Sequence, residues 1–123
     1  MVVRSWHGIV PIEKAESFRN HLLKTGVSDA KKTTGNLGVY IYSQSQDNFE
    51  HFFMVSYWDN MESIERFAGK TPQKAVCYDE DNIYDLISDP IVLHHEVMDI
   101  PRPATSGWYL EPRETRKILQ FFP

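Results

Sequence analysis

Two histidine-containing segments carry side chains suited to proton transfer near neutral pH. Trp6-His7 lies in an apolar run near the start of the sequence, and His94-His95 lies in a second apolar run, residues 91–98. An imidazole accepts or donates a proton at such pH, so these histidines are candidate general bases. Hydrogen-bond donors and aromatic walls for a binding site come from four further candidates: Arg4, Trp6, Trp58 and Tyr78.

The same residues give little support for a metal centre. Adjacent residues of a strand point to opposite faces, so His94 and His95 cannot hold one ion within a single chain. A site that combines one of them with His7, or that is shared across a dimer, stays open. The run Asp79-Glu80-Asp81 lacks the spacing and the glycine turn of a calcium loop, so we expect it to face solvent. We therefore predict no metal.

Other reactive residue types are expected to have structural roles. Cys77 is the single cysteine, which excludes an internal disulfide and fits a reducing compartment. No base flanks it in the sequence, so we expect it to be a small buried hydrophobic residue. Trp58 ends an apolar strand, which favours a place in the core over catalysis. His21 and His51 are expected at the surface.

Composition excludes several classes of function. The chain has 17 acidic and 13 basic residues and a net charge of −4, which argues against a nucleic-acid partner. No apolar run approaches the ~18 residues that span a bilayer, and the first residues lack a signal-peptide layout. With 123 residues, the chain is large enough for one core. We predict a single-domain cytoplasmic protein without a membrane partner.

The apolar pattern predicts the elements that must position these residues. β-branched and aromatic residues mark strands at residues 2–10, 37–43, 49–58 and 91–98. A first helix follows Pro11, with Phe18 and Leu22 on its apolar face, and Thr25-Gly26 ends or interrupts it. A further helical turn is expected within residues 29–34. The second and third strands are expected to form a hairpin.

A second helix is predicted to begin at Met61. Asp59 is placed as its N-cap, Glu62 completes a capping box with it, and Gly69 ends the helix in a left-handed conformation. Two short helical pieces are expected at residues 73–78 and 82–87, before the last strand.

The order β-α-β-β-α-β predicts a ferredoxin-like α+β fold with a four-stranded antiparallel sheet over residues 1–98. All strands carry apolar side chains at both parities, so we expect helices on one face of the sheet and a second subunit's sheet on the other. Residues 99–123 contain aromatic residues between prolines. We expect this segment to be an arm that packs on its own domain or on a partner subunit.

Six short segments between residues 2 and 97 together resemble a known family: Arg4-Ser5-Trp6-His7-Gly8, Gly35-Asn36-Leu37-Gly38-Val39-Tyr40, Ser56-Tyr57-Trp58-Asp59, Phe67-Ala68-Gly69, Ala75-Val76-Cys77-Tyr78 and His94-His95-Glu96-Val97. In this order they are similar to the antibiotic biosynthesis monooxygenase-like family of dimeric α+β barrels. The resemblance implies a homodimer of stacked sheets, with a pocket between sheet and helices in each subunit.

The resemblance also separates two chemistries found in that family. Haem-degrading members use an asparagine on the first strand, a tryptophan in the second helix and an axial histidine after it. The matching positions here hold Trp6, Phe67 and Cys77. The iron ligand is thus replaced, and haem degradation is disfavoured. We expect no cofactor.

The resemblance then implies a cofactor-independent monooxygenase that acts on a small aromatic or quinol-type substrate. Such chemistry needs a base, donors that hold a substrate anion, and a dry pocket. The family pattern favours Trp6 and His94 facing the pocket as catalytic residues. The expected substrate-binding residues are Arg4, Trp58, Phe67 and Tyr78. The alternative is a non-catalytic dimer of the same fold that binds a small hydrophobic ligand or has a structural role.

Overall fold

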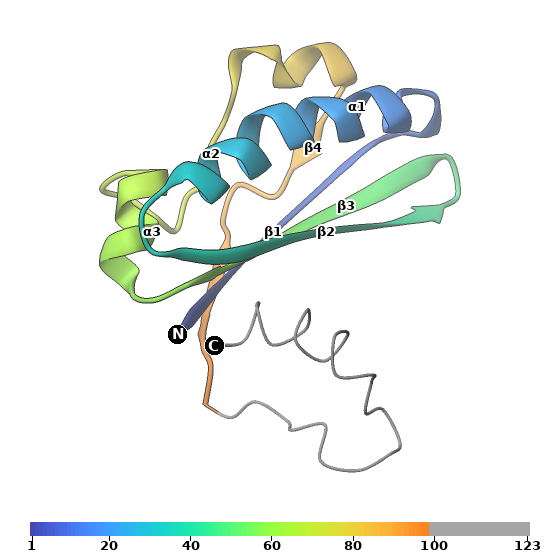
Figure 1. Ribbon diagram of the computed structural model, residues 1–123. Coiled ribbons are helices and arrows are strands. Elements are labelled where there is room, and N and C mark those ends of the chain that lie inside the picture. The colour runs from blue at the N-terminus through green and yellow to red at the C-terminus, as the bar shows by residue number, and fades with distance from the viewer. Residues whose placement is uncertain (99–123) are drawn as a thin grey trace, which may run out of the picture.

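An antiparallel sheet with helices on one face forms the framework of the computed structural model, which describes residues 1–98 (Figure 1). The predicted arm, residues 99–123, lies outside the described residues. Five strands make up the sheet: β1 (Val2–Pro11), β2 (Asn36–Gln46), β3 (Phe49–Trp58), β4 (Ile87–Ser88) and β5 (Leu93–Glu96). They are the strands that the apolar runs predict, except that the last run forms β5 alone and β4 comes before it.

The helical elements lie in two stretches of the chain, between β1 and β2 and between β3 and β4. The α-helices are α1 (Ala15–Leu22), α2 (Ser28–Lys32) and α3 (Met61–Ala68). Two 3₁₀ helices cover Ile12–Lys14 and Asp79–Tyr84, and a π-helical segment, Leu23–Val27, joins α1 to α2. The predicted interruption at Thr25-Gly26 is this π segment, and α2 is the predicted further turn.

The sheet order is β2-β3-β1-β4, and β5 also pairs with β1. β4 pairs with Gly8 and Ile9, and β5 pairs with the stretch from Val2 to Ser5. Two short strands therefore share the position of the fourth strand. The ferredoxin-like α+β fold is confirmed, with α3 and the 3₁₀ helix Asp79–Tyr84 between β3 and the last strands.

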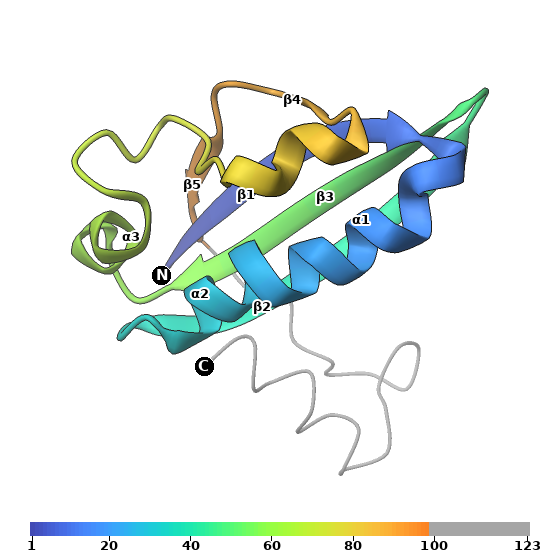
Figure 2. The ribbon, with the colours of Figure 1, turned by 90° about the horizontal axis from the view of Figure 1, so that it is seen from above.

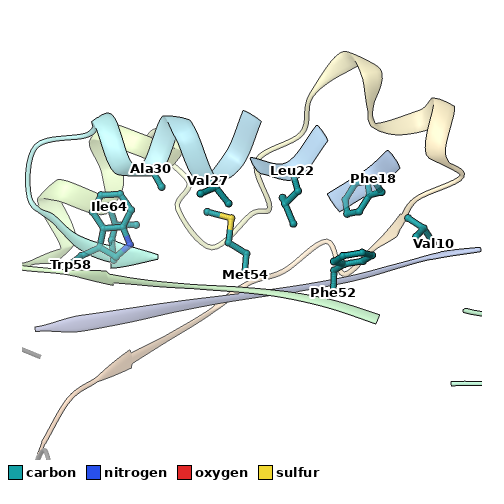
Figure 3. Close-up of a cluster of buried hydrophobic side chains, with 9 residues drawn as sticks. All are labelled: Val10, Phe18, Leu22, Val27, Ala30, Phe52, Met54, Trp58 and Ile64. Carbon is teal, nitrogen blue, oxygen red and sulfur yellow. The ribbon is translucent and has the colours of Figure 1, made fainter. Parts of the chain in front are cut away.

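The core lies between the sheet and the helices. Side chains at even positions of β3, from Phe52 to Trp58, are buried beneath the helices, as the two-residue period of a strand requires. Figure 3 shows Met54 and Trp58 pointing from β3 toward Val27 and Ala30. Viewed from above, α1 and α2 run along one side of the sheet, and the 3₁₀ helix Asp79–Tyr84 lies over β1 (Figure 2).

The opposite face of the sheet has no covering element within residues 1–98 (Figure 1). Its aromatic rings stack in a row, with Tyr42 5.3 Å from Phe53 and Phe53 4.7 Å from His7 between centroids. His7 also stacks on His51, and its Nε2 lies 2.9 Å from His51 Nδ1. His51 is thus partly exposed on the uncovered face of the sheet, and the contact with His7 covers part of it. The predicted cover of this face by a second subunit stays a prediction.

The start of α3 differs from the sequence prediction by one residue. Asn60, not Asp59, is the N-cap, and its Oδ1 accepts a hydrogen bond from the backbone N–H of Ser63 at 3.0 Å. Asp59 instead accepts a hydrogen bond from the Ser63 hydroxyl. Both residue types can cap a helix, so the sequence pattern fits either position. Gly69 ends the helix with a φ of 88°, but its ψ of −169° lies outside the left-handed helical region.

The prediction of a helical piece at residues 73–78 is wrong. Lys74 forms an isolated β-bridge with Ile91, and the backbone N–H groups of Ala75 and Val92 donate to the carbonyl oxygens of Pro90 and Gln73. These bonds hold the segment extended against the chain before β5. The piece predicted at residues 82–87 is also displaced, because the helix there spans Asp79–Tyr84.

Candidate functional site

A cavity lies between sheet and helices, next to the core. Side chains of β1 and β3 form its floor, and the π segment, α3 and the chain from 76 to 86 contribute its walls. Its volume is about 40 Å³, which is room for about three water molecules. An aromatic ligand therefore requires lining side chains to move apart. Most of the lining is apolar or aromatic, and its polar residues are Arg4, Thr25, Ser56, Tyr78 and Asp81.

Arg4 is a buried cation on the cavity floor. Arg4 is 4% exposed, and its guanidinium donates hydrogen bonds to the carbonyl oxygens of Pro72 and Lys74. The guanidinium carbon also lies 5.7 Å from the ring centroid of Phe67. Burial lowers the pKa of Arg4 from 12.5 to about 10, so the charge persists at neutral pH. No carboxylate of residues 1–98 forms an ion pair with Arg4.

His94 lies beside Arg4 and not in the cavity lining. β5 pairs with β1 so that His94 is directly opposite Arg4, on the helix-covered side of the sheet. The predicted position of His94 in the pocket itself is not what the structure shows. His94 Nε2 is 3.1 Å from Arg4 Nη1 and must accept this hydrogen bond, because a guanidinium only donates. Burial, Arg4 and His95 lower the pKa of His94, so the ring is neutral at pH 7. His95 is exposed.

Trp6 forms a wall of the cavity. Its indole N–H donates to Ser88 Oγ at 2.8 Å, so this donor is already used within the protein. A Cβ on Gly8 would stand 2.6 Å from the nearest atom of the Trp6 ring, which explains why a glycine occupies that position. The hydrogen bond to Ser88 of β4 orients the indole, and Gly8 leaves the space that the ring occupies.

Phe67 lines the cavity, whereas Trp58 does not. Trp58 is fully buried in the core, and its indole N–H donates to Ser56 Oγ at 2.8 Å. Its ring stacks on Phe67 at 5.6 Å between centroids. Of the residues expected to bind substrate, Trp58 therefore supports the site from behind, through Phe67 and Ser56.

Tyr78 contributes a phenol to the cavity wall. Its hydroxyl donates to Asp29 Oδ2 at 2.7 Å. Burial and this hydrogen bond, together with the charges of Asp29 and Asp81, raise the pKa of Tyr78 well above 10. The phenol thus keeps its proton at every physiological pH and acts as a fixed neutral group. The structure brings Arg4, Trp6, Phe67 and Tyr78 together at the cavity, and their roles in catalysis and binding stay predictions.

Asp81 and His21 are functional candidates that the sequence analysis missed. Asp81 lines the cavity, with one carboxylate oxygen 2.7 Å from His21 Nε2 and the other accepting the backbone N–H of Tyr78 at 2.9 Å. The His21 side chain is only 8% exposed, so its predicted surface position is wrong. A signal was present, because His21 follows Phe18 by three residues on the apolar face of a helix. Asp81 could be identified as a cavity residue only from the fold.

Cys77 is exposed and lies outside the cavity lining, which corrects its predicted burial. The position that would offer an axial iron ligand in haem-degrading relatives thus presents no side chain to the cavity. Within the described part of the chain, no three histidine, cysteine, aspartate or glutamate side chains are placed to hold a metal ion. In the same part, no helix is long and apolar enough to cross a membrane.

Comparisons with known proteins agree with this fold. A family model described as antibiotic biosynthesis monooxygenase matches residues 2–77. A Deinococcus radiodurans structure assigned to antibiotic biosynthesis monooxygenases is 18% identical, covers 83% of this chain and 97% of its own, and has a TM-score of 0.58. Rv0793 from Mycobacterium tuberculosis is 14% identical, covers 83% of this chain and 100% of its own, and has a TM-score of 0.51.

A third solved structure is a variant of MhuD with two manganese protoporphyrin IX molecules bound per active site. It is 17% identical, covers 83% of this chain and 100% of its own, and has a TM-score of 0.54. At these identities the three structures show a shared fold. No curated protein sequence matches the chain. The family model covers more than half of the chain, and the chain therefore belongs to the antibiotic biosynthesis monooxygenase family.

Proposed function

We propose that this protein is a cofactor-independent monooxygenase that oxidises a small phenol or quinol in the cavity. The observation that carries the proposal is Arg4, a buried cation on the cavity floor with neutral partners among the described residues. Such a charge favours an anionic ligand, which supplies the missing opposite charge in a region of low dielectric. Family membership supports the oxygen chemistry.

Arg4 supports the step that makes dioxygen reactive. Dioxygen is a triplet and reacts slowly with a neutral closed-shell phenol, whereas a phenolate can transfer one electron to it. The resulting radicals join in a carbon–oxygen bond and give a peroxide on the ring. Loss of the ring C–H proton and cleavage of the O–O bond then leave a quinone. One oxygen atom stays as the new carbonyl, the other leaves as water, and the substrate supplies all four electrons.

The remaining site residues orient and enclose the substrate. Trp6, held by Ser88, and Phe67, backed by Trp58, form apolar walls that exclude water. Tyr78 offers a neutral ring edge. His94 acts through Arg4 as a positioning residue, because its Nε2 accepts from the guanidinium. Each of these contacts favours a flat ring lying above the guanidinium.

The assembly that we propose is a homodimer of stacked sheets in the cytoplasm. The face that carries Tyr42 and Phe53 is aromatic and lacks cover within residues 1–98, and a second copy would bury it. The lone Cys77 fits a reducing compartment.

Oxygen consumption with a panel of 1-naphthol, resorcinol and 1,4-dihydroxynaphthalene tests the function. We expect uptake above the rate without protein, one heavy-oxygen atom from labelled dioxygen in the quinone, and a loss of about 10²–10³-fold in Arg4→Gln. The exposed residue Arg19, changed to glutamine, is the matched control. No uptake with any phenol overturns the proposal, and binding without uptake would instead support the non-catalytic ligand-binding dimer.

A further inference from the structure

We propose that Asp81, supported by His21, is the proton acceptor for the substrate hydroxyl in the cavity. This inference rests on the proposed function and adds a residue that neither the sequence pattern nor the family comparison indicated. It follows from which groups reach the cavity and from the contacts that hold them.

Only three titratable side chains of residues 1–98 line the cavity: Arg4, Tyr78 and Asp81. Arg4 is a cation and has no lone pair to accept a proton. Tyr78 donates its hydroxyl hydrogen to Asp29 and keeps that proton. His94 lies outside the lining and its Nε2 already accepts from Arg4. Asp81 is therefore the one lining group in the described chain that can take a proton from a ligand.

The surroundings of Asp81 hold its carboxylate in one orientation. His21 Nε2 lies 2.7 Å from one oxygen, and the Tyr78 backbone N–H donates to the other at 2.9 Å. The imidazole is itself fixed by aromatic rings, with Tyr84 at 4.8 Å and Phe18 at 5.9 Å between centroids. Each carboxylate oxygen keeps a second lone pair for a substrate hydroxyl. A carboxylate oriented by a histidine is a pre-positioned base.

Arg4 and Asp81 present opposite charges to a ligand in the cavity. Arg4 belongs to the sheet, and Asp81 belongs to the 3₁₀ helix above β1. A ligand between them meets a positive charge on the floor and a negative one on the wall. The neutral hydroxyl therefore faces Asp81, and once it has lost its proton, Arg4 balances the negative charge of the phenolate.

The proton balance closes on Asp81. The carboxylate takes the hydroxyl proton as the phenolate forms, and the protonated acid gives it to the ring peroxide after the carbon–oxygen bond has formed. Asp81 then takes the ring C–H proton, and that electron pair becomes the carbonyl while the O–O bond breaks. The hydroxide that leaves receives this proton as water. The base is regenerated and no external reductant is consumed.

The test compares Asp81→Asn with wild type across pH, using 1,4-dihydroxynaphthalene. At pH 7 we expect kcat to fall by about 10²–10⁴-fold with KM nearly unchanged, the usual contribution of a general base. The deficit should close as the pH nears about 10, where a phenol ionises without help. A purely structural role would not give this recovery. Other charged or titratable groups lie near Asp81 and can contribute to the pH profile of kcat. They are His21 of α1, Asp29 of α2, Tyr78, Tyr84 and Arg4.

Matched variants separate the possible failures. Asp79→Asn alters an exposed carboxylate of the same helix and should keep the wild-type rate. His21→Gln should lower kcat less than Asp81→Asn does, because the carboxylate remains. Wild-type turnover that is retained in Asp81→Asn at pH 7 overturns this inference and leaves the monooxygenase standing. A wild-type protein that takes up no oxygen with any phenol contradicts the proposed function itself.

Discussion

The two faces of the sheet differ in how their polar groups are used. On the helix-covered face, Arg4 is buried and its guanidinium has only neutral partners among residues 1–98. On the other face, His7 is partly exposed and joins Asp89 at 3.1 Å and His51 at 2.9 Å. A charge in water needs no special partner, whereas a buried charge is costly unless something compensates it.

This difference indicates which face carries function. Adjacent residues of β1 and β3 divide between the faces, so neighbours in sequence meet opposite environments. The uncompensated charge, the cavity and the Asp81–His21 pair all lie on the covered face. The other face has a row of stacked rings, which suits association more than catalysis.

The largest expected effect comes from the neighbours Phe52 and Phe53, which point to opposite faces. Phe52 is fully buried, so Phe52→Ala should lower the free energy of unfolding by about 3–5 kcal/mol. Phe53→Ala should cost clearly less in dilute protein, and its effect should grow with protein concentration if a second copy covers that face. Urea unfolding at several protein concentrations measures both. Equal costs at all concentrations would contradict the difference between the faces.

The second effect concerns the buried charge. Arg4→Gln should lower binding of an ionised phenol by about 10–100-fold, since hydrogen bonds to a charged group contribute about 1.5–3 kcal/mol. Its unfolding free energy should fall by at most about 1–3 kcal/mol, because the acceptors of Pro72, Lys74 and His94 lose a donor while the cost of burying the cation is removed. Equilibrium titration with 4-nitrophenol, whose ionised form is yellow, reports the binding. His7→Gln on the other face is the control and should bind as wild type.

A smaller effect is expected at Gly8, where the covered face has no room. In Gly8→Ala the new methyl would meet the Trp6 ring, and overpacking of this kind costs about 1–3 kcal/mol. Displacement of Trp6 should also change its fluorescence and raise KM. The double variant Gly8→Ala with Trp6→Leu should recover most of the stability. No recovery would mean that Leu86, the other neighbour of that position, dominates the clash.

The smallest effect is a pH dependence that arises from His94. Its folded pKa lies below the value of 6.5 for the unfolded chain, so the unfolded state binds more protons in this range. The free energy of unfolding should therefore fall as the pH drops past about 6.5, and level off below the lowered folded pKa. His94→Gln should remove this slope, whereas His95→Gln should retain most of it, because burial and Arg4 are the larger causes of the lowered pKa. Thermal unfolding between pH 8 and pH 4 measures the difference.

Local patterns were sufficient to predict the sheet and the first part of the site. The apolar pattern and the β-branched content predict the ends of β1 and β3 to within one residue, because the apolar residues of each strand reflect how it is buried. The period places Arg4 and Trp6 on one face of β1, whereas the choice of that face, and of His94, as the pocket side rests on the family resemblance. The split of the fourth strand and the extended backbone near Lys74 depend on contacts with distant segments, so no local pattern contains them.

The Asp81–His21 pair shows where such prediction ends. The two residues are 60 positions apart and come from different helices. Asp81 lies in an acidic run that is typical of solvent-exposed sequence, and Asp79 and Glu80 are indeed exposed. Only the third carboxylate turns inward, because the first turn of the 3₁₀ helix brings it to the Tyr78 backbone. A tight turn of three residues sets that direction.

The π segment between α1 and α2 affects how relatives should be aligned and how their second helix is oriented. Each residue added to a helix rotates the following residues by about 100° around the helix axis. A single-residue deletion within Leu23–Val27 would thus rotate α2 and turn Ala30 away from the core. The extra residue also places Gly26 over Met54, where a Cβ would lie 3.3 Å from the sulfur. Relatives that lack this residue should carry a differently phased second helix, and a gap aligned here marks a change in the shape of the pocket.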